Sequence, residues 1–155
     1  AKIYAAKGRP SDNPLIVHIA RVEALQPLAA EIPDAVYRLA EAFWPGPLTM
    51  IVKKSERVPR ETSGGLDTVA VRLPGDANAR ALIEAAGLPI AAPSANTSGR
   101  PSPTEARHVA EDLGGKIDMI LDGGAVAVGL ESTIVDLSGS VPILLRPGAI
   151  TVEML

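Results

Sequence analysis

The chain has no cysteine and only two histidines, His18 and His108. Without thiols it can form neither disulfides nor thiolate metal sites, and two distant histidines do not make the ligand set of a bound metal ion. We therefore expect no protein-bound metal. The absence of cysteine also fits a reducing compartment, so we expect a cytoplasmic protein.

Aromatic residues make up only 3% of the chain, although 46% of its 155 residues are apolar. The core must therefore consist mainly of Ala, Val, Ile and Leu, which favours an α/β domain with buried strands. This length fits a single domain. No apolar run approaches the roughly 18 residues that a membrane-spanning helix needs, and no signal-peptide pattern opens the sequence.

The formal net charge is -3. A protein that binds RNA mainly through a broad basic surface usually carries the opposite sign, so the charge favours a small-molecule site without excluding a local basic patch. No Walker loop, dinucleotide fingerprint or nucleophile elbow is present.

Short apolar runs bounded by Pro and Gly predict strands, and longer stretches with helical spacing predict helices. They do not alternate strictly, which favours a mixed twisted sheet with surrounding helices over a doubly wound fold. The predicted strands are residues 15–19, 48–52, 68–73, 89–92, 117–121, 132–137 and 142–145, and the predicted helices are residues 1–6, 21–30, 34–43 and 76–86, with two more after Ser102 and from Ile150 onward.

The first polar cluster holds Lys7 and Arg9, two residues apart after the first predicted helix. On a solvated loop, the lysine would give a polyphosphate a point charge and the arginine a planar fork. The same residues also suit a helix C-terminus, where Gly8 ends the helix and cations favour the negative end of the dipole. The residues alone leave both interpretations open.

The second cluster is the polar loop 93–101 and the helix start that follows it. Ligands in α/β sheets bind at such strand-end loops, and a helix N-terminus offers free N–H groups to anions. Ser102 can cap that helix, with Pro103 in the first position and Glu105 completing a capping box. A solvated turn with good capping chemistry is an equal alternative.

The third cluster is spread along the chain. Thr68 and Arg72 are four residues apart in a predicted strand, so both point to the same face. A buried arginine needs a partner, which a ligand carboxylate or, more commonly, a structural Asp or Glu would supply. Arg146 ends an apolar run in the same way. A lone histidine among apolar neighbours, such as His18, is more often a hydrogen-bonded core residue than a catalyst.

Six segments, in order along the whole chain, resemble motifs of the YrdC family. They are Lys7-Gly8-Arg9-Pro10 with Asn13-Pro14-Leu15-Ile16-Val17-His18, Trp44-Pro45-Gly46-Pro47-Leu48-Thr49, Thr68-Val69-Ala70-Val71-Arg72-Leu73-Pro74, Pro93-Ser94-Ala95-Asn96-Thr97-Ser98-Gly99, Gly129-Leu130-Glu131-Ser132-Thr133-Ile134-Val135-Asp136 and Leu145-Arg146-Pro147-Gly148.

The resemblance implies a twisted sheet with a large concave, positively charged cavity. It implies an enzyme, a nucleotidyltransferase that joins L-threonine and bicarbonate into N-carboxythreonine, whose carboxylate attacks the α-phosphorus of ATP and releases pyrophosphate. The resulting threonylcarbamoyl-AMP would serve the modification of adenosine 37 in tRNA through separate transfer proteins. Such chemistry depends on positioning and charge more than on a protein nucleophile, and Mg2+ would be held mainly by the ATP phosphates.

By the same resemblance, residue roles carry over to the matching positions. The catalytic set around the phosphates would be Lys7, Arg9, Ser94 and Asn96. ATP would contact Arg9, Asn13, Thr68, Ser94, Ser102 and Arg146. Threonine would contact His18, Arg72, the main chain of Ala92 and Ser132, with Arg72 pairing its carboxylate.

Two family features are missing from residues 1–155, which we interpret as a single YrdC-like domain. A Pro-Thr-Glu-Thr-x-Tyr-Gly-Leu strand is expected upstream of Ala1, where it would complete the threonine pocket, and a longer subgroup of the family carries a C-terminal domain. One alternative function is a carbamoyltransferase module of hydrogenase maturation, which the lack of cysteine disfavours. Another is a non-catalytic binder of double-stranded RNA or tRNA, which the net charge disfavours.

Overall fold

The computed structural model describes residues 2–155. The helices are α1 (Lys2–Lys7), α2 (Asp34–Phe43), α3 (Arg60–Ser63), α4 (Ala77–Ala86) and α5 (Ala106–Leu113), with the 3-10 turns η1 (Val22–Leu25) and η2 (Val152–Met154). The strands are β1 (Ile16–His18), β2 (Leu48–Lys53), β3 (Thr68–Arg72), β4 (Ile90–Ala92), β5 (Thr133–Asp136) and β6 (Ile143–Arg146). None of these helices is long and apolar enough to cross a bilayer.

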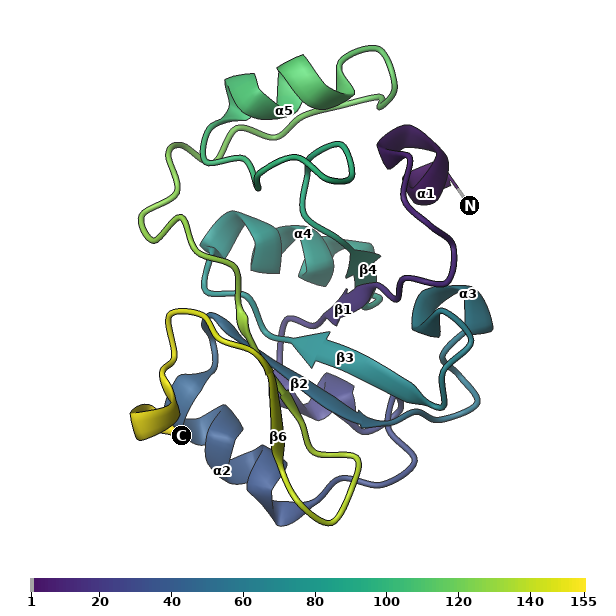
Figure 1. Cartoon of the computed structure of the whole chain (residues 1–155), viewed down its shortest axis with the longest axis vertical. Helices are drawn as coiled ribbons and strands as arrows, with labels where there is room; N and C mark the ends of the chain where they lie inside the picture. Colours follow the sequence, from purple (N-terminus) through teal and green to yellow (C-terminus); the bar gives the residue numbers. More distant parts are fainter. Residues whose placement is uncertain (1) are drawn as a thin grey trace.

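The strands form one six-stranded sheet in the order β4-β1-β3-β2-β5-β6 (Figure 1). The pairs β1–β3 and β2–β5 are parallel, and the remaining neighbours are antiparallel. The mixed sheet confirms the predicted α/β fold class. Because the chain crosses over between these pairs, motifs that are far apart in the sequence meet on one sheet.

The two faces of the sheet differ in what covers them. Along β3, Val69 and Val71 are buried on one face, while Ala70 and Arg72 are only half-buried on the other. The helix α2 covers the first face through Val36 and other apolar residues, and α1 and α5 lie on the opposite side of the sheet (Figure 1). Each fully buried valine stabilises the fold by about 1.5–3 kcal/mol, so the α2 face supplies the main core.

The turn between α2 and β2 positions an acceptor for the site. Trp44 Nε1 donates to the main-chain oxygen of Leu48 at 2.8 Å, and Gly46 N donates to Leu73 O at 2.9 Å. A Cβ atom at Gly46 would lie 2.4 Å from the main-chain oxygen of Phe43, so only glycine fits there. The turn thereby directs the Gly46 carbonyl toward the end of β3.

The predicted strand 117–121 does not form, and this prediction is wrong. Met119 and Leu121 are 72% and 64% exposed, and the segment pairs with neither edge strand, β4 or β6. The predicted helix 21–30 shortens to η1, because Pro27 has no N–H with which to continue a helix and Ala30 N donates instead to Lys53 O. From Ile150 onward the structure has only the short turn η2.

The predicted capping box at Ser102 is also wrong. The helix α5 begins at Ala106, and its first flanking residue, Glu105, makes no side-chain cap. The hydroxyl of Ser102 donates instead to Glu131 Oε1 at 2.9 Å, because the 101–105 segment lies against the loop that contains Glu131. The predicted helices over α2 and α4 are confirmed, and that over α1 is confirmed for residues 2–6, Ala1 lying outside the described residues.

Candidate functional site

A cavity of about 590 Å³ lies between the open face of the sheet and the loops that follow its strands. Its volume is in the range of small-molecule sites. All six strands contribute to the floor, and the walls come from residues 9–15, 93–103 and 126–132. The residues of the floor are Ile16, His18, Ile51, Ala70, Arg72, Ala92, Ile134, Leu145 and Arg146.

Nine of the twelve residues that the sequence predicted for the site line this cavity. Lys7, Thr68 and Asn96 do not line it, although Thr68 lies on the same face of β3 as Arg72. The lining residues are Arg9, Asn13, His18, Arg72, Ala92, Ser94, Ser102, Ser132 and Arg146.

The charged side chains of the cavity are predominantly positive. Three arginines, Arg9, Arg72 and Arg146, line it together with one carboxylate, Glu131, whereas the whole chain carries a net charge of -3. A concave surface with charges of one sign concentrates ligands of the opposite sign. The cavity is therefore the local basic region that the net charge had left open.

Arg72 is a cation without a carboxylate partner among residues 2–155. Its Nε atom donates to Gly46 O at 3.0 Å. Burial, and then the nearby charge of Arg146, lower the pKa of Arg72, yet an arginine stays protonated in proteins. Because no described acid pairs with it, the terminal nitrogens of Arg72 are suited to an anionic ligand.

His18 presents a neutral ring to the cavity. Its Nδ1 atom lies 3.1 Å from Ile16 O, and since a carbonyl oxygen only accepts, Nδ1 carries the proton of that bond. Burial, followed by the charge of Arg72, lowers the pKa of His18 below its usual value. The Nε2 atom of the neutral ring is then a hydrogen-bond acceptor at pH 7, so His18 is half-buried and hydrogen-bonded yet also lines the cavity.

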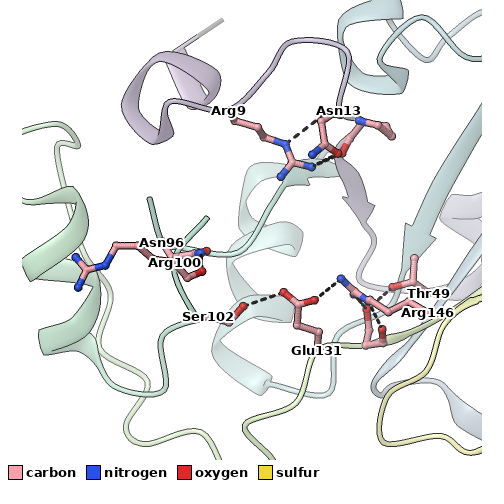
Figure 2. Close-up of polar contacts among 10 residues, drawn as sticks. Arg9, Asn13, Thr49, Asn96, Arg100, Ser102, Glu131 and Arg146 are labelled. Atoms are coloured by element: carbon pink, nitrogen blue, oxygen red, sulfur yellow. Dashed lines mark hydrogen bonds and ion pairs between the residues drawn. The ribbon is translucent and has the colours of Figure 1, made fainter. Parts of the chain in front are cut away.

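Arg9 is oriented by the loop that it belongs to. Its Nη2 atom donates to Asn13 Oδ1 at 2.7 Å and to Pro14 O at 2.8 Å (Figure 2). Gly8 just before it has φ +61° and ends α1. The glycine therefore ends the helix, as one interpretation of this cluster predicted, and the arginine that follows lines the cavity.

Lys7 is 4% exposed, and the expectation of a solvated loop is wrong for it. It is the last residue of α1, and the loop 93–101 folds over its side chain. The ammonium donates to Ser94 O at 2.5 Å and to Asn96 O. Burial, and then the charge of Arg9, lower the pKa of Lys7, while Asp112 opposes this effect.

Asp112 on α5 holds the same loop from the other side. Its carboxylate accepts from Thr97 N at 2.9 Å and from Arg100 Nη1, and Asn96 Nδ2 donates to Arg100 O at 2.6 Å. The loop is thus fixed at several points, and Ser94 lies at the cavity wall. No pattern in the sequence indicates this role of Asp112, because an acid on a helix is usually solvated.

A second polar network crosses from the 101–105 segment to the sheet. Glu131 accepts from both Ser102 and Arg146, and Arg146 in turn donates to Ser132 (Figure 2). The hydroxyl of Ser132 lies 2.8 Å from that of Thr49 on β2. In the sequence, Glu131 is part of a family motif and carries no predicted role.

Comparison with known proteins identifies the group to which these motifs belong. A model of the Sua5/YciO/YrdC family, described as telomere recombination, matches residues 1–148. The chain belongs to this family. The predicted resemblance to YrdC proteins is thereby confirmed.

The chain is similar to two curated members of the Sua5/YciO/YrdC family that carry the name threonylcarbamoyl-AMP synthase. It is 59% identical to the Pyrococcus abyssi protein over 152 residues and 53% identical to the Bacillus subtilis protein over 155 residues. The matches cover 98% and 99% of this chain but 45% of each relative. The chain therefore spans less than half the length of these two relatives.

A solved family structure, P. abyssi Sua5 complexed with L-threonine, has a TM-score of 0.96 and 59% identity to this chain. It is matched over 98% of this chain and 45% of its own length. The mixed sheet and its helices are thus those of a Sua5 protein.

Proposed function

We propose that this chain is the catalytic domain of a threonylcarbamoyl-AMP synthase, a nucleotidyltransferase that uses ATP, L-threonine and bicarbonate. The observation that carries the proposal is Arg72, a cavity-lining cation without an acid partner in residues 2–155, beside the neutral ring of His18. Relatives of this name at up to 59% identity, one of them crystallised with L-threonine, support it.

In this proposal threonine binds at the β1–β3 end of the cavity. The terminal nitrogens of Arg72 would bind its carboxylate as a bidentate pair, the geometry that arginine favours. His18 Nε2 would accept a hydrogen bond from the amino or hydroxyl group, while Ser132 and the main chain of Ala92 complete the contacts. Threonine would then be held through its carboxylate and its amino or hydroxyl group, and its carboxylate would be paired with Arg72.

ATP would occupy the wall formed by the loops. Arg9 and Arg146 supply positive charge for the phosphates, and Asn13, Ser94 and Ser102 supply neutral donors and acceptors. Lys7 and Asn96, which lie behind the wall, act in this proposal by shaping the loop that presents Ser94. Thr68 does not line the cavity. It would contact the nucleotide only if the nucleotide extends beyond the cavity toward the start of β3.

The reaction has two steps. The amino group of threonine first loses a proton to solvent. Its nitrogen then bonds to the bicarbonate carbon, a second N–H proton and the bicarbonate hydroxyl leave as water, and N-carboxythreonine results. An oxygen of the new carboxylate then bonds to the α-phosphorus, the bond from that phosphorus to the bridging oxygen breaks, and pyrophosphate leaves with the electron pair. Preorganised cations lower the barrier of such a transfer by stabilising the developing charge.

Mg2+ would arrive with ATP, and its charge would neutralise part of that of the phosphates. Within residues 2–155 no three His, Asp or Glu side chains gather into a metal site, and Glu131 is the one carboxylate of the lining. This donor set fits an ion whose ligands come chiefly from phosphate oxygens and water.

The product would pass its threonylcarbamoyl group to adenosine 37 of tRNA through separate transfer proteins. RNA is therefore a later recipient in this proposal and not a ligand that the reaction needs. A binder of double-stranded RNA or tRNA would instead show RNA affinity that falls steeply with salt and that ATP leaves unchanged.

The test is pyrophosphate release by the full-length protein, with ATP, threonine or bicarbonate omitted in turn. We expect release only when all three are present, together with a product that contains threonine, one carbon from bicarbonate and AMP. Release that is indifferent to threonine, or no release at all, would overturn the proposed function.

A further inference from the structure

The carboxylate of Glu131 joins two of the residues assigned above to ATP. Its Oε1 atom accepts from Ser102 Oγ at 2.9 Å, and its Oε2 atom accepts from Arg146 Nη1 at 2.5 Å (Figure 2). Ser102 belongs to the segment before α5, and Arg146 ends β6. One acidic side chain therefore occupies donors in the wall and in the floor of the cavity.

Arg146 is also oriented by contacts other than that with Glu131. Its Nε and Nη2 atoms donate at 3.0 Å to the main-chain oxygen and the hydroxyl of Ser132, and Ser132 is 3% exposed. Glu131 therefore takes only the Nη1 atom. Release of Glu131 would leave an arginine that is already oriented and has one donor free to bind an anion.

Glu131 is held less firmly than the groups it contacts. Its side chain is 47% exposed, and within residues 2–155 its carboxylate has only the two contacts described. A half-exposed ion pair of this kind contributes little, whereas a polyphosphate brings several negative charges. A carboxylate that stayed in place would repel those charges and compete for Arg146.

We propose that Glu131 is a positioning residue that occupies the nucleotide subsite in the empty protein and is displaced when phosphate oxygens reach Arg146 and Ser102. This inference rests on the proposed binding of ATP. Glu131 lies near the end of the irregular stretch that precedes β5, and a second hydrogen bond, from Val126 N to Thr104 O at 2.9 Å, joins that stretch to the 101–105 segment. Displacement would therefore also loosen the residues between Val126 and Glu131.

The experiment compares ATP binding by calorimetry in the full-length wild-type protein, Glu131→Gln and Glu131→Asp, with Mg2+ and with EDTA. Glutamine removes the charge, while aspartate keeps it but is one methylene too short to bridge both donors. We expect both variants to bind ATP about fivefold more tightly, the effect of losing one competing contact of about 1 kcal/mol. Glu105→Gln, which breaks the exposed pair with Arg107, should leave the affinity unchanged.

Three results would overturn the proposal. Unchanged or weaker binding in Glu131→Gln would show that the carboxylate does not compete with the nucleotide. Weaker binding only in the presence of Mg2+ would make Glu131 a ligand of the ion instead. Tighter binding in Glu131→Gln but not in Glu131→Asp would show that only the general field of the charge matters.

A second measurement is independent of the proposed function. Amide hydrogen exchange of residues 126–131, followed without nucleotide, should be faster in Glu131→Gln than in the wild-type protein, and equal rates would overturn the contact itself. If the wild-type protein binds no ATP, the proposed function fails, whereas the exchange rates still report whether Glu131 ties this stretch in place.

Discussion

The ammonium of Lys7 lies 2.5 Å from the main-chain oxygen of Ser94, although 87 residues separate the two in the sequence. The contact joins the end of α1 to the loop that presents Ser94 to the cavity. A lysine that a motif associates with phosphates is therefore, in this structure, a structural link between two walls of the site. Lys7 and Arg9, two residues apart, should consequently differ in what their loss does.

Lys7→Met keeps the length of the side chain and removes its donors. We expect the free energy of unfolding to fall by about 2 kcal/mol, since hydrogen bonds to charged groups contribute about 1.5–3 kcal/mol, and we expect pyrophosphate release to be lost. Arg9→Met should lose the activity at nearly unchanged stability. Urea unfolding of both variants measures this, and wild-type stability of Lys7→Met would contradict the structural role.

Arg72→Lys tests the carboxylate site, because lysine keeps the charge but not the planar fork. We expect the KM for threonine to rise about 10- to 100-fold, which corresponds to a loss of about 1.4–2.8 kcal/mol. The KM for ATP should stay within about twofold, since Arg72 is not among the assigned ATP contacts. Steady-state kinetics with each substrate varied in turn decides this, and a change confined to the KM for ATP would refute the assignment.

Asp112→Asn should disturb the loop 93–101 without touching either substrate. The amide cannot pair with Arg100 as a carboxylate does, so we expect kcat to fall about tenfold, while the KM for threonine changes little. Glu111→Gln changes an exposed neighbouring acid and serves as the control. Rescue of kcat by Asp112→Glu would support positioning, and equal kinetics in Asp112→Asn and Glu111→Gln would contradict it.

His18 should make stability depend on pH. Burial and Arg72 lower its pKa in the folded protein, so between that pKa and the unfolded value of about 6.5 the unfolded chain binds more protons. The stabilising contribution is complete above about pH 6.5 and is lost as the pH falls through the lowered pKa. Tm should therefore decrease from pH 7 to pH 5.5 more steeply in the wild-type protein than in His18→Gln, and parallel curves would contradict this.

Much of the sheet could be predicted because its strands are short apolar runs that turn residues delimit. The alternation in β3 also placed Arg72 on the same face as Thr68, as observed. Residues 117–121 are an apolar run of the same kind, yet they pair with neither edge strand, β4 or β6. Whether such a run joins a sheet depends on the whole fold. The alternation of apolar and polar residues identifies which face of a sheet a side chain occupies, but not which strand lies next to it.

Some features of the site could be predicted from the sequence, and others could not. Residues at strand ends and in the polar loops were predictable as cavity residues, because such loops gather at one edge of an α/β sheet. The partners of charged groups were not predictable. A sequence does not say that Arg146 pairs with Glu131 while Arg72 pairs with no acid of residues 2–155, because a shift of a few ångströms in one loop would change either contact.

Helix α2 packs on one face of the sheet, and the other face forms the floor of the cavity. In the proposed function, the substrates would take the place on this face that a second helical layer has in an ordinary α/β sandwich. The melting temperature should then rise with substrate concentration, so that occupancy and folding become one equilibrium.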